Sequence, residues 1–107
     1  MMTLYYDKDG KSLSFQEFIT LFRNENYRRI ELDSSDEYTV STIWLGIDHN
    51  LDFEFTTPII FETMVFGKGR ESLECLRAAT LEEAKENHSR IAQEYGFRTT
   101  RFSRMQL

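Results

Sequence analysis

The chain has 107 residues and a formal net charge of −5, with 40% hydrophobic and 29% charged residues. This length and composition are typical of a single, ordinary globular domain that is long enough to bury a core without disulfides or metals. Cys75 is the only cysteine, which excludes an intrachain disulfide and a cysteine-based zinc site and suits a reducing cytoplasm. No apolar run approaches the roughly 20 residues of a membrane helix, and the N-terminus does not resemble a signal peptide. We therefore expect a cytoplasmic protein with no membrane partner.

The charges are distributed unevenly along the chain. Between Arg29 and Lys68 there are eight acidic residues and no Lys or Arg, whereas the tail 97–107 has three arginines and no acid. Phosphate contacts need clustered basic residues, so the acidic middle argues against nucleic acid as a partner, and three arginines do not reverse this. The acids either keep a hydrophobic sheet soluble or attract a partner of opposite charge.

The N-terminal part predicts a hairpin and a helix. In "LYYDKDGKSL", apolar residues flank Asp-Lys-Asp-Gly, a combination typical of a strand, a turn and a second strand. Ser14 and Glu17 have the spacing of a capping box, and aromatic and aliphatic residues recur behind them at helical intervals. These signals predict a helix over 15–23, and "YRRIEL" is expected to begin the next strand.

Three further strands and a second helix follow. The strands are expected at 37–47, at 59–66 after Pro58, and at 72–79, because these segments are rich in Thr, Val, Ile and aromatic residues. Thr80 and Glu83 form a second capping box, and the helix that it begins should run to about Tyr95 and end at Gly96. The connections between 37 and 79 are too short for crossover helices. We therefore predict an α+β fold, a single domain over 1–107 with a mostly antiparallel sheet of about four strands and two helices packed on one face.

Alternation along the two clearest strands selects candidate functional residues. It places Trp44 and Asp48 on one face of the first strand, and Glu62 and Met64 on one face of the second. We expect these four residues to line a common surface. Glu62 is a carboxylate in an apolar row, where burial without a partner would be costly. It is either a ligand-binding or acid–base group, or a structural residue paired with an arginine such as Arg77.

The histidines and the cysteine are further candidates. Asp48 beside His49 could orient the imidazole or help to hold a metal, but the pair could equally mark the end of a strand. His88 lies on the apolar stripe of the last helix and is expected in or near the core. Because the histidines do not have the spacing of a recognised metal site, the sequence predicts no metal and no cofactor. Cys75 alternates with Leu73 and is expected to be buried and unreactive.

Three strings resemble the motifs of a family of small proteins encoded by bacteriophages and prophages. They are "TVSTIWLGIDHN", "PIIFETMVFG" and "AATLEEAKENH". In that family a V-S-T-x-W-L-G-x-D-H stretch precedes a Pro-led I-F-E-T-M-V-F strand and a T-x-E-E-A helix that ends in a His. The resemblance covers Thr39 to His88, implies a phage or prophage origin, and points to no particular activity. The motif positions that it picks out are Trp44, Asp48, His49, Glu62, Thr63, Met64 and His88.

Two classes of function follow from these features. The first is a non-catalytic binding protein in the host-cell cytoplasm that forms a homo-oligomer and engages a host protein or sequesters a small ligand. Its binding residues would be Trp44, Asp48, His49, Glu62 and Met64. The alternative is a small hydrolase or lyase that uses His49 with Glu62 or Asp48, with or without a metal. A component of the virion is a third possibility.

Overall fold

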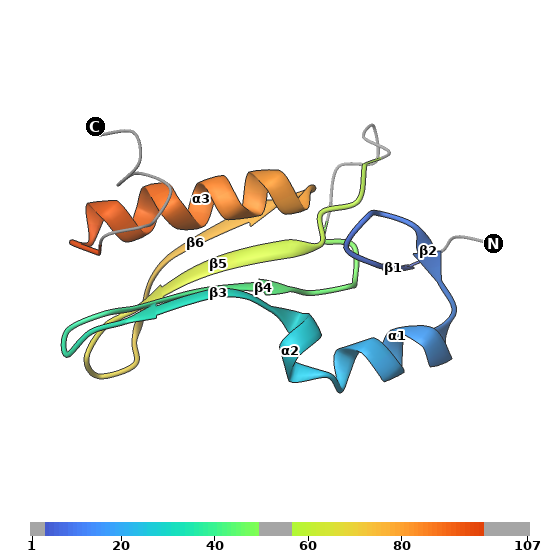
Figure 1. Ribbon diagram of the computed structural model, residues 1–107, viewed down its shortest axis with the longest axis horizontal. Helices are drawn as coiled ribbons and strands as arrows, with labels where there is room; N and C mark the ends of the chain where they lie inside the picture. The colour runs from blue at the N-terminus through green and yellow to red at the C-terminus, as the bar shows by residue number, and fades with distance from the viewer. Residues whose placement is uncertain (1–3, 50–56, 98–107) are drawn as a thin grey trace.

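The computed structural model describes residues 4–49 and 57–97 and has an α+β fold (Figure 1). In chain order the elements are β1 (Tyr5–Tyr6), β2 (Ser12–Leu13), α1 (Phe15–Phe22), α2 (Glu25–Arg28), β3 (Arg29–Ser34), β4 (Thr39–Trp44), β5 (Phe61–Phe66), β6 (Ser72–Ala78) and α3 (Leu81–Glu94). Strands β1 and β2 form a small hairpin, and β3 to β6 form an antiparallel sheet in which neighbours in sequence are neighbours in space. The predicted fold class is confirmed.

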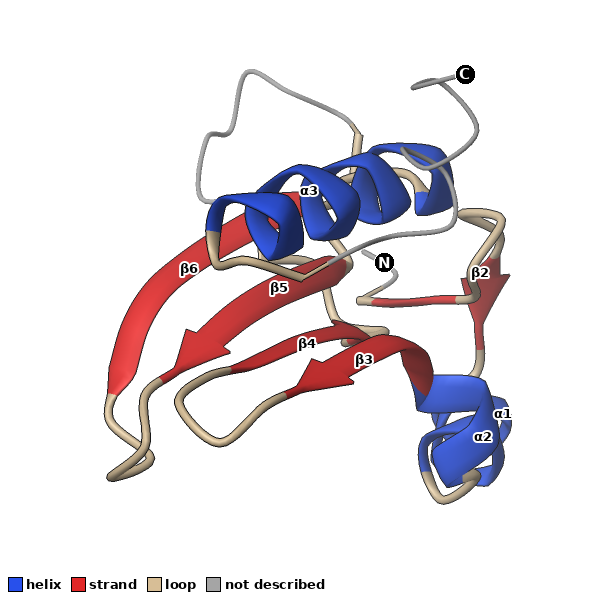
Figure 2. Ribbon diagram, turned by 60° about the vertical axis from the view of Figure 1, so that its left-hand side comes forward, coloured by secondary structure: helices blue, strands red, loops and turns tan. Residues whose placement is uncertain are grey.

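Helix α3 runs along one face of the four-stranded sheet and contacts all four strands (Figures 1 and 2). Helices α1 and α2 lie at one end of the sheet, where α1 packs against the β1–β2 hairpin and α2 against β3 and β4. Over the centre of the opposite face, Figure 2 shows no helix from the described ranges 4–49 and 57–97. Among the helices of these ranges, none combines the length and the apolar composition that a membrane span requires.

The face of the sheet under α3 is built in three layers. An apolar layer of Val40, Val65, Ile91 and Ala92 lies toward one end, and a second layer around Trp44, Phe61 and Ala84 lies toward the other. Between them the same strands and helix supply Thr42, Thr63 and His88, which are all buried. Two hydrophobic clusters therefore enclose one polar layer.

Trp44 attaches the N-terminal elements to the sheet. Its indole N–H donates to the carbonyl oxygen of Tyr6 at 3.0 Å. The ring of Tyr27 meets it edge-on at a centroid distance of 4.9 Å, and the ring of Phe18 lies 5.8 Å away. Burying a side chain of this size contributes about 2–3 kcal/mol. Trp44 thus contacts the hairpin, α1 and α2 from the end of β4, and backbone hydrogen bonds between the hairpin and Gly46 add to this attachment.

The helix ends follow the predicted capping signals with one difference. At α1 the Glu17 amide donates to Ser14 Oγ at 3.1 Å, and the Ser14 amide donates back to Glu17 Oε1 at 2.9 Å. At α3 the Glu83 amide likewise donates to Thr80 Oγ1, but the Glu83 carboxylate accepts from the Thr80 hydroxyl instead of from its amide. Gly96 follows α3 with φ +88°, which confirms the predicted left-handed position.

Several predicted strand boundaries are wrong, and the strands expected to start at 37 and 59 begin at Thr39 and Phe61. The segment "YRRIEL" does not begin as a strand, because Asn24 accepts a hydrogen bond from the Tyr27 amide and caps the short helix α2. The strand predicted over 37–47 ends at Trp44, because Gly46 adopts φ +75° and turns the chain. Residues 50–56 of the predicted connection and 98–107 of the predicted tail lie outside the described residues.

Gly46 should be far less tolerant of a side chain than Gly10, although both have positive φ values, +75° and +84°. A Cβ at Gly46 would lie 2.5 Å from Phe18 Cε1 and 2.6 Å from Trp44 Cζ2, whereas one at Gly10 meets nothing within 4 Å. Both Gly→Ala substitutions carry the backbone cost of about 1–2 kcal/mol. We expect Gly46→Ala to lose about 1–3 kcal/mol more from overpacking. Urea denaturation measures the difference, and equal losses would contradict this account of the Trp44 packing.

Candidate functional site

The surface expected from Trp44, Glu62 and Met64 does not form. Trp44 is completely buried on the side of α3. In the register of the sheet Trp44 is opposite Phe61, whereas Glu62 is opposite Ile43, and partners across an antiparallel pair share a face. Glu62 and Met64 therefore lie on the other face. The prediction was wrong because alternation assigns faces within one strand, but only the register relates the faces of two strands.

Asp48 and His49 have structural partners in the segment that follows β4, beyond the turn at Gly46. Asp48 Oδ1 accepts a hydrogen bond from the Ile59 amide at 2.9 Å, and His49 Nδ1 lies 2.8 Å from the Ile47 carbonyl oxygen, to which it donates. The His49 amide also donates to the carbonyl oxygen of Ile59. Ile59 precedes Glu62 by three residues, or about 10 Å along an extended chain. The structure therefore does not place His49 beside Glu62, and the pair proposed for a hydrolase is not assembled.

Glu62 is paired with Arg77 on the face of the sheet that is turned away from α3, which we call the open face. Arg77 Nε lies 3.3 Å from Glu62 Oε2, as the structural interpretation of Glu62 predicted. The strand residues on the open face are Arg29, Leu32, Ser34, Thr39, Ser41, Ile43, Glu62, Met64, Phe66, Ser72, Cys75 and Arg77. Most side chains from its two central strands are half-buried. The open face thus combines an ion pair between β5 and the edge strand β6 with apolar side chains on the neighbouring strands.

Cys75 is exposed on the open face, so the prediction that it is buried was wrong. It belongs to β6, which is an edge strand of the sheet. Its Sγ lies 3.5 Å from Glu62 Oε2. Partial desolvation raises the pKa of the Cys75 thiol, and the negative charge and the hydrogen bond of Glu62 raise it further. The thiol is therefore held protonated near neutral pH, which makes it a weak nucleophile.

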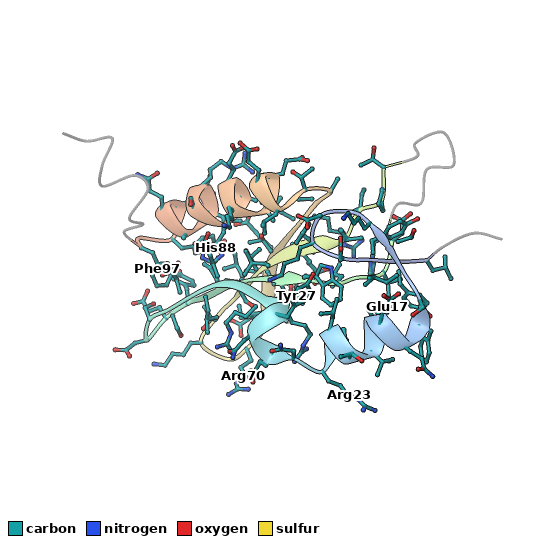
Figure 3. All side chains as sticks on the ribbon, turned by 45° about the vertical axis from the view of Figure 1, so that its right-hand side comes forward. Glu17, Arg23, Tyr27, Arg70, His88 and Phe97 are labelled. Atoms are coloured by element: carbon teal, nitrogen blue, oxygen red, sulfur yellow. The ribbon has the colours of Figure 1, made fainter. Side chains whose placement is uncertain are left out.

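His88 is the centre of a polar network on the opposite side of the sheet. The side chain is 0% exposed and points from α3 toward the strands (Figure 3). Its Nδ1 lies 2.7 Å from Thr42 Oγ1, and Thr42 Oγ1 lies 2.7 Å from Thr63 Oγ1. The register of the sheet explains why the two hydroxyls are in contact, because Thr42 and Thr63 are direct partners across β4 and β5. The expectation that His88 lies in the core is confirmed.

Two carboxylates from β3 complete the network. Asp33 Oδ2 lies 2.8 Å from His88 Nε2, and Glu31 Oε2 lies 3.8 Å from the same nitrogen. Unlike His88, the side chains of Asp33 and Glu31 are about one-third exposed, at 33% and 31%. One ligand atom from each of the three residues lies within 4.8 Å of the other two, so this group could hold a metal ion. The imidazole forms the buried end of the cluster and the carboxylates form its solvent-facing end.

The sequence contained part of the signal for this cluster. Glu31 and Asp33 are two apart in a strand and therefore share a face, although in the sequence they are two of eight acids in one stretch that contains no Lys or Arg. Of the motif positions named above, Thr63 and His88 join the cluster, Glu62 and Met64 lie on the open face, and Trp44 lies in the core.

Comparisons of the chain with protein-family models, with curated proteins and with solved structures gave no match.

Thr42 should contribute more to stability than Thr63, because only Thr42 contacts the imidazole. Thr42→Val removes the partner of a buried ring nitrogen, which costs about 1–3 kcal/mol. Thr63→Val leaves that contact in place and removes one hydroxyl–hydroxyl bond, with an expected loss of about 1 kcal/mol. Both changes preserve the side-chain shape, so urea denaturation of the two variants isolates the hydroxyls. A larger loss for Thr63→Val would contradict the network as described.

The reactivity of Cys75 should depend on Glu62. Glu62→Gln removes the negative charge and lowers the pKa of the thiol, and each unit of pKa gives up to about tenfold more thiolate. We expect Cys75 in this variant to react several-fold faster with iodoacetamide at about pH 8. Glu86→Gln, an exposed position on α3, is the matched control and should leave the rate unchanged. An unchanged rate in Glu62→Gln would show that Glu62 does not act on the thiol.

Proposed function

We propose that the protein is a non-catalytic binding protein whose open face contacts another protein. The observation that carries this proposal is a sheet with one face packed under α3 and the other face presenting half-buried apolar side chains around an ion pair. Ile43, Met64 and Phe66 stand on the two central strands, and Leu32 is exposed on the edge strand β3. A sheet face of mixed apolar and polar side chains fits a protein partner better than a small molecule, which requires a concave site.

A second copy of the chain is the partner that the charges favour. The chain carries a net charge of −5, but the charged strand residues of the open face are Arg29, Arg77 and Glu62. This face is therefore not acidic, and two copies can approach through it without the repulsion that their net charges would cause elsewhere. In a two-fold symmetric contact, Arg77 of each copy can meet Glu62 of the other.

A host protein is the second partner within the same proposal. Its support is the resemblance of Thr39–His88 to small phage and prophage proteins, which implies a phage or prophage origin and therefore a host cell as the setting. Binding of a host protein and self-association both use an exposed apolar face, so variants of that face test them together. A hydrolase or lyase that uses His49 has less support, since His49 and Glu62 have separate partners.

The test is native mass spectrometry of the untagged protein and of two variants that each introduce one carboxylate. Met64→Glu places the charge on the open face, where burial in a contact would be costly and would weaken association at least about tenfold. Gln93→Glu places the same charge on an exposed position of α3 and should leave association unchanged. A third variant, Glu62→Gln, should also weaken association. Circular dichroism checks that this variant remains folded.

Each result has a defined meaning. An oligomer that is lost in Met64→Glu and retained in Gln93→Glu supports self-association through the open face. If the wild-type chain is a monomer, co-purification of a host protein with Gln93→Glu but not with Met64→Glu supports the second partner. Association that is equal in both variants would reject the open face as the contact surface, and a retained small molecule would indicate ligand sequestration instead.

A further inference from the structure

Glu31, Asp33 and His88 bring two carboxylates and one imidazole together from β3 and α3. We propose that these three side chains bind a divalent first-row transition-metal ion such as Zn²⁺. The inference is independent of the open face, because β3 presents these two acids toward α3. It assigns a binding site to residues that the proposed function does not use.

The distances between the ligand atoms fit a coordinated ion. With bonds of about 2.0–2.2 Å from the metal to nitrogen and oxygen, neighbouring ligand atoms are about 3.0–3.5 Å apart. His88 Nε2 lies 2.8 Å from Asp33 Oδ2 and 3.8 Å from Glu31 Oε2, and no two of the three ligand atoms are more than 4.8 Å apart. Small rotations of the two partly exposed carboxylates would bring all three atoms to bonding distance. The ion would enter from the solvent-facing side and meet the imidazole at the inner end.

The second nitrogen of His88 is already held in the manner of a metal-bound histidine. Ligating histidines use their other ring nitrogen for a hydrogen bond that fixes the ring orientation. Here Nδ1 lies 2.7 Å from Thr42 Oγ1, which in turn contacts Thr63 Oγ1. A hydroxyl can donate or accept. In the tautomer that carries its one proton on Nδ1, Nε2 offers a lone pair to the ion. Nδ1–H then donates to Thr42, and Thr42 donates to Thr63.

The local charge favours a cation. Glu31 and Asp33 are two like charges on the same face of one strand, and a cation bound between them would reduce their repulsion. No Lys or Arg occurs between Ile30 and Gly67, so the central strands β4 and β5 supply no basic side chain to this cluster. One neutral imidazole with two carboxylates suits Zn²⁺, Mn²⁺ or Fe²⁺, whereas Mg²⁺ and Ca²⁺ prefer oxygen ligands alone. Three protein ligands would leave further coordination positions for water.

The chain contains only two histidines, His49 and His88. An NMR titration of the ¹⁵N-labelled protein therefore shows directly which of the two imidazole rings binds the ion. We expect Zn²⁺ added to the untagged full chain to shift the His88 ring nitrogens at one ion per chain and to leave His49 unchanged. Addition of Mg²⁺ at the same concentration should shift neither ring. Binding of Zn²⁺ should also raise the thermal midpoint, because an ion that binds only the folded state stabilises it.

Matched variants from the same hairpin test the carboxylates. Asp33→Asn and Glu31→Gln should each weaken Zn²⁺ binding at least about tenfold, while Asp36→Asn and Glu37→Gln, which are exposed in the β3–β4 turn, should change it less than twofold. Cys75→Ser should also leave the affinity unchanged, which separates this site from the exposed thiol. The proposal is overturned if Zn²⁺ shifts only His49, if binding requires Cys75, if Asp33→Asn binds like wild type, or if the Kd is weaker than about 1 mM.

Discussion

The hydrogen bond between the buried imidazole of His88 and the hydroxyl of Thr42 is the contact on which the rest of the sheet–helix packing depends. An imidazole that is 0% exposed requires partners for both ring nitrogens, since an unpaired buried polar group is costly. Nδ1 has Thr42 on β4 and Nε2 has Asp33 on β3. One residue of α3 thereby specifies the position of the helix relative to two strands. Apolar contacts alone would tolerate sliding of the helix along the sheet.

This polar layer also explains why the hydrophobic core is divided. The cluster around Val65 and Ile91 and the cluster around Trp44 and Phe61 lie on either side of Thr42, Thr63 and His88. The larger cluster joins the sheet to α1, α2 and the hairpin through Trp44. The smaller one holds the C-terminal half of α3. Each cluster is apolar and non-directional, so the register between them comes from the hydrogen bonds of the layer that separates them.

The two faces of the sheet have different chemistry as a result. The face under α3 collects carboxylates from β3 at its rim and an imidazole at its centre, an arrangement suited to a cation. The open face collects basic residues, one ion pair and apolar side chains, an arrangement suited to a protein surface. The acidic stretch of the sequence is therefore not a uniformly acidic surface. Because Glu31 and Asp33 turn toward α3, the open face is left without that negative charge.

The sequence by itself determined the α+β class, the two capped helices, the three long strand segments and the burial of His88, because capping, alternation and helical periodicity are local signals. It also allowed the pairing of Glu62 with Arg77 as one of two interpretations. Only the tertiary structure decided that Trp44 and Glu62 lie on opposite faces, that Cys75 is exposed, and that Glu31 and Asp33 meet His88. The physical reason is that these facts depend on strand register and on the placement of α3, which join residues up to 57 positions apart in the chain, as in Glu31 and His88.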